Sequence, residues 1–157
     1  PGDCFYVAYE ACRIAVKYMT PVMLLTDGYL ANGSEPWIVP DIKKLPPIDV
    51  KFADKSNIVD GQFMPYLRKK DTLARPWAKP GTENLEHRIG GIEKEDVTGN
   101  VNYDPENHHF MVKTRALKVQ NIANELPPTD VYGDKSGDLL ILSWAVHKVH
   151  AGLLLKL

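Results

Sequence analysis

Seven of the twelve prolines lie between Pro36 and Pro80, both included. Proline lacks a backbone N–H and clashes with the preceding turn of a helix, so no helix of ordinary length survives this spacing. Residues 38–103 are therefore predicted to form a long, proline-rich irregular connector. Connections of this length are usually functional, linking, or ordered by a partner.

The segment before the connector predicts one helix and one strand. Small and apolar residues recur at three- and four-residue spacing from Ala8 to Met19, which indicates an amphipathic helix with Asp3 as its expected N-cap. The run "VMLLT", residues 22–26, follows Pro21 and is typical of a buried parallel strand. A turn signal, Asp27-Gly28, ends this strand.

A second helix and strand follow the connector. Asp104 is the predicted N-cap, Pro105 takes the first helical position, and Pro127-Pro128 stop the helix. The run "LLILSW", residues 139–144, is the second buried-strand candidate. The expected apolar face of this helix consists of Val112, Ala116, Val119, Ile122, Ala123 and Leu126.

Two partial helix–strand units define an α/β fold class, but a complete doubly wound domain needs several strands. We therefore expect this chain to be a fragment of a larger one. Its length of 157 residues fits one ordinary domain or pieces of two.

Composition excludes several classes of protein. The net charge of -1, without a basic stripe, gives no argument for nucleic acid binding. The longest apolar run is far too short for a membrane span, and "PGDCFY" is no secretory signal. Cys4 and Cys12 would lie about 12 Å apart along a helix, too far for a disulfide, and two free thiols fit a reducing cytoplasm.

Four stretches in this order carry a family resemblance: "PVMLLTDGYLANGSEPW", "LARPWAKPGT", "LEHRIGGIEKEDVTGNVNYDPENH" and "GDLLILSW". From Pro1 to about Trp144 the chain resembles the alpha subunit of 2-oxoacid:ferredoxin oxidoreductases, most closely the 2-oxoglutarate (KorA-type) branch. The ordered set is specific, although each piece alone is weak. The family's main functional motifs in this subunit, a "YPITPS"-like strand end and a "GPSTGLPT"-like loop, are absent from this sequence.

The resemblance implies an enzyme that decarboxylates a 2-oxo acid with thiamine diphosphate and magnesium, and forms an acyl-CoA. Electrons would pass through an iron–sulfur cluster on the partner beta subunit to ferredoxin. Residues 1–37 would be the C-terminal part of a pyrimidine-binding-type (thiamine diphosphate fold) domain. Residues 104–144 would start a domain like the C-terminal domain of transketolases. We expect no catalytic residue and no cofactor on this chain alone.

Asp27, Tyr29 and Asn32 are the candidate cofactor-binding residues. They follow the predicted strand at its carboxyl end, where ligands usually sit in open α/β sheets. The interpretation we favour is turn chemistry, because Asp and Asn side chains commonly bond to nearby backbone.

His87 and Arg88 are the candidate substrate-binding residues, since they could bind an anion or act on a proton. They lie in "LEHRIGGIEKEDVTGN", residues 85–100, which is too polar for a core strand and too glycine-rich for a stable helix. The interpretation we favour is an interdomain connector whose polar groups bond to backbone and to a partner domain.

The remaining conspicuous residues receive structural interpretations. Trp37 and Trp77 are expected to pin the proline-rich segment to a domain. His108 and His109 are adjacent in a helix and point about 100° apart, so they are not expected to chelate a metal.

Residues 145–157 form an atypical tail. After "LILSW" the family continues with a glycine turn, whereas this chain reads "AVHKVHAGLLLKL". We hypothesise a frameshifted end, so that His147 and His150 are not ligands.

The alternative to an inactive enzyme fragment is a non-catalytic binding or scaffold module. Exposed helix and strand surfaces predict self-association of the isolated chain.

Overall fold

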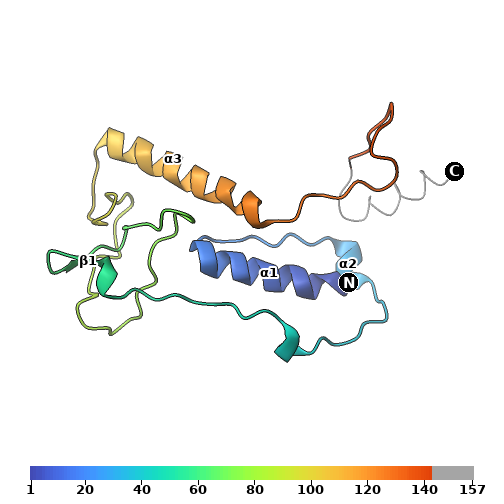
Figure 1. The fold of residues 1–157 in the computed structure, drawn as a ribbon, viewed down its shortest axis with the longest axis horizontal. Coiled ribbons are helices and arrows are strands. Elements are labelled where there is room, and N and C mark those ends of the chain that lie inside the picture. The colour runs from blue at the N-terminus through green and yellow to red at the C-terminus, as the bar shows by residue number, and fades with distance from the viewer. Residues whose placement is uncertain (143–157) are drawn as a thin grey trace.

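The computed structural model describes residues 1–142. Two long helices dominate it: α1 (Asp3–Tyr18) and α3 (Pro105–Ile122). Figure 1 shows α1 near the centre and α3 above it, with connector loops gathered beside the C-terminal end of α1. The short elements are α2 (Gly28–Asn32), the 3₁₀ turns η1 (Ile42–Lys44), η2 (Lys55–Asn57) and η3 (Ala123–Glu125), and the strands β1 (Ile58–Val59) and β2 (Gln62–Phe63).

Helix α1 forms where the apolar spacing predicts it, but its start differs from the prediction. Gly2 occupies the N-cap position and supplies no side-chain hydrogen bond, while Asp3 is already helical. The prediction of Asp3 as N-cap was wrong. Its carboxylate still lies in the first turn, where a negative charge interacts favourably with the helix dipole and stabilises the helix. Met19 ends the helix in the left-handed conformation, with φ of 46°.

The predicted strand at residues 22–26 is not formed. Figure 1 shows residues 20–27 running back along α1, and this segment pairs with no strand among residues 1–142. Met23 and Leu25 are 84% and 90% exposed. A β-strand forms only when it makes backbone hydrogen bonds to a neighbouring strand, and the described residues supply no neighbouring strand here. The second candidate also forms no strand over 139–142, and its last two residues lie outside the described part.

Between residues 38 and 103 the structure has no helix longer than a 3₁₀ turn, as the prolines predict. The segment is nevertheless ordered. Strands β1 and β2 form an antiparallel hairpin that pairs Ile58 with Phe63. Its turn residues Asp60 and Gly61 both have positive φ, the hallmark of a tight two-residue hairpin. Within residues 1–142, three of the five buried hydrophobic residues come from this segment: Phe63, Ala74 and Leu85.

Helix α3 begins as predicted. The Asp104 side chain accepts from the backbone N–H groups of Glu106 (2.7 Å) and Asn107 (3.3 Å), and Pro105 occupies the first helical position. Two N–H groups that the helix itself leaves unpaired are thereby satisfied.

The predicted apolar face of α3 was wrong. Its buried residues are Met111, Thr114 and Lys118, which lie on a different face. Val112 and Val119, from the predicted face, are 43% and 57% exposed. Periodicity detects an apolar stripe but not which neighbour covers it. Here the end of α1 and the connector loops cover the other face.

The Glu125 carboxylate, in the η3 turn that follows α3, connects this end of α3 to α1. One Glu125 oxygen accepts from Lys17 Nζ (2.5 Å) and Tyr18 Oη (2.7 Å), and the other faces Arg13 Nη1 at 3.3 Å. These donors lower the pKa of Glu125 to about 2. Burial and the neighbouring Glu125 carboxylate raise the pKa of Tyr18 to about 12.

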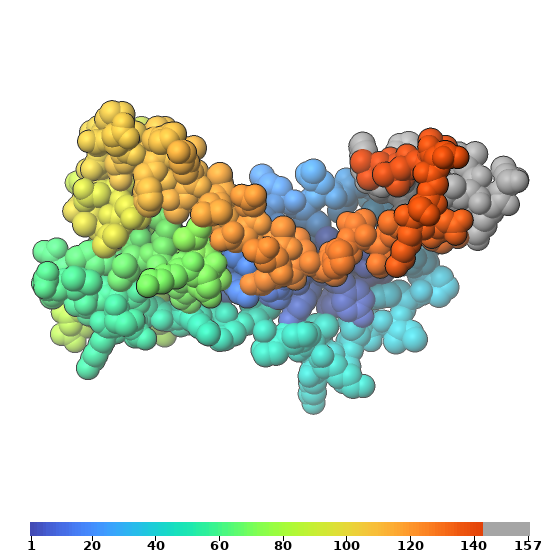
Figure 2. Space-filling model, turned by 45° about the horizontal axis from the view of Figure 1, so that its top comes forward, coloured from blue at the N-terminus to red at the C-terminus, as the bar shows by residue number. Residues whose placement is uncertain are grey.

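Trp37 and Trp77 pin the proline-rich segment to α1, which confirms their predicted role. Trp77 donates its indole N–H to the Val16 carbonyl at 2.9 Å, satisfying an acceptor in the last turn of α1. Trp37 packs against Phe5, with ring centroids 5.7 Å apart. Between these contacts the segment around η1 projects from the body (Figure 2).

Candidate functional site

A polar pocket lies among the connector loops. Its volume is about 310 Å³, at the small end of ligand-binding cavities. Three stretches of chain meet there: the β1–β2 hairpin with the residues after it, the beginning of the "LEHRIGG" stretch, and the turn near residue 99. The lining residues are Gly61, Gln62, Phe63, Met64, Asn84, Glu86, His87, Arg88, Thr98, Gly99 and Asn100.

His87 is oriented by two contacts. Its Nδ1 lies 2.7 Å from the Leu85 carbonyl oxygen, and its ring meets the Phe63 ring edge-on at a centroid distance of 5.0 Å. A carbonyl only accepts hydrogen bonds, so Nδ1 carries a proton. The neutral ring therefore keeps Nε2 as an acceptor, and the protonated ring offers Nε2–H as a second donor. The first contact matches the predicted bonding of this loop to its own backbone.

At Arg88, within residues 1–142, the backbone is held by a hydrogen bond, but the side chain is not. Its backbone carbonyl accepts a hydrogen bond from Lys94 Nζ at 3.2 Å, and Lys94 itself is buried. Its side chain is exposed and has neither an ion pair nor a hydrogen bond among residues 1–142. The backbone of Arg88 is thus fixed while its guanidinium is free to bind a ligand.

The rest of the loop is tied to the start of α3. The Asn107 side chain donates to the Lys94 carbonyl (3.0 Å) and accepts from the Asp96 N–H (3.2 Å). Gly99 has φ of 69°, and a Cβ there would lie 2.7 Å from the side chains of Pro65 and Tyr66. Glycine is therefore required at this position, because any side chain would push the turn away from the pocket.

Asp27, Tyr29 and Asn32 are not among the residues that line the polar pocket. Asp27 Oδ1 caps α2 by accepting from the Leu30 N–H at 2.9 Å, and the Asn32 side chain donates to the Gly28 carbonyl at 2.7 Å. Tyr29 is 72% exposed. The capping bonds are the turn chemistry that the sequence favours. The second oxygen of Asp27 is buried without a hydrogen-bond partner in the described chain.

A group of cations that sequence reasoning missed packs beneath α3. Arg68 faces Asp96 at 3.5 Å, and both Arg68 and Arg75 lie over the Tyr66 ring, at 5.4 Å and 4.4 Å. Lys118 donates to the Met19 carbonyl at 3.1 Å. Burial and the nearby arginines lower the pKa of Lys118 to about 8. The available signal was the spacing of Lys118 from Met111 and Thr114, which places all three on one helix face.

The remaining candidate metal ligands do not form a metal site among residues 1–142. His108 Nδ1 contacts Glu93, which also faces Arg115 at 3.3 Å. No group of three or more His, Cys, Asp or Glu residues within 1–142 is arranged to hold a metal ion. Cys4 and Cys12 are free thiols. None of the helices described is both long and apolar enough to cross a membrane.

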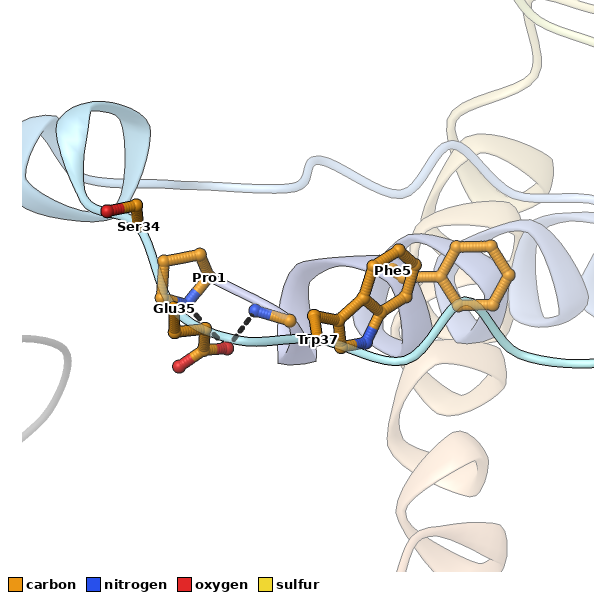
Figure 3. Close-up of a pocket in the computed structure, with 6 residues that line it drawn as sticks. Pro1, Phe5, Ser34, Glu35 and Trp37 are labelled. Carbon is orange, nitrogen blue, oxygen red and sulfur yellow. Dashed lines mark hydrogen bonds and ion pairs between the residues drawn. The ribbon is translucent and has the colours of Figure 1, made fainter.

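A second, smaller cavity of about 280 Å³ lies near the beginning of α1. Figure 3 shows Trp37 beside Phe5 on one side, and Glu35 near Pro1 on the other. The Glu35 carboxylate accepts a hydrogen bond from the Gly2 N–H. These contacts hold the residues after α2 against α1.

Comparison with known proteins identifies a family. Residues 1–104 match the family described as pyruvate flavodoxin/ferredoxin oxidoreductase, thiamine diphosphate-binding. No solved structure matches the chain.

Three relatives show how the chain relates to full-length proteins. It is 49% identical over 146 residues to "2-oxoglutarate oxidoreductase subunit KorA" of Mycobacterium tuberculosis, covering 92% of this chain and 21% of that protein. It is 28% identical over 152 residues to "2-oxoacid:ferredoxin oxidoreductase 1, subunit alpha" of Aeropyrum pernix, covering 95% and 23%. It is 29% identical over 153 residues to "2-oxoacid:ferredoxin oxidoreductase subunit alpha" of Saccharolobus solfataricus, covering 93% and 23%. The chain thus spans about a fifth of the length of these relatives.

Proposed function

Because the chain belongs to the pyruvate flavodoxin/ferredoxin oxidoreductase, thiamine diphosphate-binding family, we propose that it is part of the alpha subunit of a 2-oxoglutarate:ferredoxin oxidoreductase. The observation that carries this proposal is the 49% identity, over 92% of the chain, to a 2-oxoglutarate oxidoreductase subunit. Identity to the two archaeal 2-oxoacid enzymes is 28% and 29%, which supports 2-oxoglutarate over a broader substrate range.

The reaction we assign is the oxidative decarboxylation of 2-oxoglutarate with coenzyme A to an acyl-CoA. Electrons then pass to ferredoxin through an iron–sulfur cluster on a beta subunit. Thiamine diphosphate supplies the carbanion chemistry when bound, while the protein contributes binding and orientation. We place this complex in the cytoplasm.

The described residues do not fit the diphosphate end of the cofactor. That end is held through a magnesium ion, and no group of three or more His, Cys, Asp or Glu side chains within residues 1–142 is arranged to hold a metal ion. Asp27 has one unpaired buried oxygen, but its other oxygen caps α2. We therefore assign the diphosphate and its metal to the beta subunit, and a supporting role in the fold to Asp27, Tyr29 and Asn32.

The domain division follows the same proposal. Residues 1–37 end a pyrimidine-binding-type domain, and residues 38–103 connect it to a transketolase C-terminal-like domain that starts at residue 104. The family match ends at residue 104, where the Asp104 cap begins α3. That coincidence supports the second boundary.

The test is reconstitution. The alpha subunit that contains this sequence is co-produced with its beta subunit, and ferredoxin reduction is followed with 2-oxoglutarate and coenzyme A. We expect reduction that needs both compounds and thiamine diphosphate. A complex that oxidises no 2-oxo acid would refute the proposal. Calorimetry of the 157-residue chain with thiamine diphosphate and magnesium should show no binding, and a micromolar affinity would contradict our assignment of the cofactor to the partner.

A further inference from the structure

We propose that Arg88 selects a dicarboxylic 2-oxo acid, by pairing its guanidinium with the carboxylate at the far end of the substrate. The proposal rests on the 2-oxoglutarate activity assigned above. It makes Arg88 a specificity-determining residue and the polar pocket the place where the distal carboxylate lies.

The first argument is the state of the arginines. Guanidinium groups pair with carboxylates through two parallel hydrogen bonds, so arginine is well suited to recognise a carboxylate. Four of the five arginines are already engaged by an ion pair or an aromatic ring. Arg88 is the one arginine with neither kind of contact within residues 1–142. The engaged arginines are Arg13, Arg68, Arg75 and Arg115.

The second argument is preorganisation. The backbone of Arg88 is held by Lys94, whose Nζ donates to the Arg88 carbonyl at 3.2 Å. Lys94 is 5% exposed, and its own carbonyl accepts from the Asn107 side chain of α3. The start of the Arg88 side chain is therefore fixed relative to α3, which lowers the entropy lost when a ligand binds.

The third argument is the pocket around it. A carboxylate needs several donors, and amide side chains provide them without adding charge. Gln62, Asn84 and Asn100 line the same pocket, and protonated His87 would add Nε2–H as a donor. A volume of about 310 Å³ suits one end of a small diacid and would be poorly filled by a methyl group.

One lining residue, Glu86, carries a negative charge, so its replacement should change the affinity for a carboxylate in the opposite direction to replacement of Arg88. Glu86 belongs to the pocket wall, and its carboxylate repels a bound anion. Replacing Glu86 with glutamine removes this repulsion. If the distal carboxylate lies in this pocket, the Glu86→Gln variant binds 2-oxoglutarate more tightly, whereas Arg88→Gln binds it more weakly.

The experiment uses the full alpha subunit assembled with its beta subunit, and compares 2-oxoglutarate with the monocarboxylic 2-oxobutyrate. For Arg88→Gln we expect the KM for 2-oxoglutarate to rise about 10- to 100-fold, the range of a lost charge-assisted hydrogen bond. We expect kcat, and the KM for 2-oxobutyrate, to stay near the wild-type values. Arg88→Lys should lie between, because lysine keeps the charge but loses the two-pronged geometry.

Lys79→Gln is the matched control, since Lys79 is an exposed cation outside the pocket. An equal loss for both acids would show that Arg88 holds the loop rather than the substrate, and would overturn the proposal. So would an unchanged KM for 2-oxoglutarate. If Arg88→Gln fails to assemble, Glu86→Gln decides alone, and its failure to lower that KM contradicts the proposal. A wild-type complex inactive on every 2-oxo acid would refute the proposed function instead.

Discussion

The Glu125 cluster makes the attachment of α3 to α1 dependent on pH. Lowering the pKa of Glu125 from 4.5 to about 2 corresponds to about 3 kcal/mol of stability at neutral pH, at about 1.4 kcal/mol per pKa unit. The side chain is 29% exposed, so solvent screening reduces the expected value to about 1–2 kcal/mol.

The direction with pH follows from the depressed pKa. Folding favours the charged carboxylate, so the stabilisation is complete above pH 4.5 and disappears as the pH falls toward 2. Glu125→Gln should therefore lower the free energy of unfolding by about 1–2 kcal/mol at pH 7. The difference from wild type should shrink by more than half at pH 3.

Urea unfolding of the alpha subunit, followed by tryptophan fluorescence at both pH values, measures this difference. Glu83→Gln is the control, because Glu83 is exposed and has no ion pair within residues 1–142. A destabilisation of the same size at pH 3 and pH 7 would refute the reasoning, since it would show that shape and not charge holds the contact.

Three further predictions concern packing. Trp77→Phe should destabilise the subunit by about 1 kcal/mol, because the Val16 carbonyl loses its indole donor; thermal unfolding that matches wild type would contradict this. Burial and nearby cations lower the pKa of Lys118 from 10.5 to about 8. Between these pH values the unfolded chain binds more protons than the folded one, so the free energy of unfolding should rise by about 1–3 kcal/mol from pH 8 to pH 10.5. Denaturation curves of Lys118→Met should lack this rise. The isolated chain should self-associate through its exposed apolar segment, including Met23 and Leu25. Light scattering that shows a monomer at high concentration would exclude association.

Part of this structure is determined by short stretches of adjacent residues. Asp104 followed by Pro105 determines the start of α3, because a capping carboxylate and a residue without an N–H need only their immediate neighbours. The prolines between Pro36 and Pro80 exclude long helices in the same local way. The ordered motifs also sufficed to predict the family, which the match over residues 1–104 confirms.

Other features depend on contacts with distant parts of the structure, which the local sequence does not specify. Residues 22–26 have the composition of a strand, but a strand forms only when a neighbouring strand accepts and donates its hydrogen bonds. The apolar spacing in α3 is real, yet tertiary packing buried Met111 and Lys118 instead of Val112 and Val119.

The polar pocket shows the same division. The sequence singled out His87 and Arg88 by residue type, because an imidazole and a guanidinium can bind anions wherever they stand. Only the folded chain brings Gln62 and Asn100 beside them, and only there does Lys94 hold the backbone of Arg88 while leaving its side chain free. Local patterns determine what a segment of this protein can form, and contacts between distant residues decide which groups meet, because those contacts depend on the packing of the whole chain.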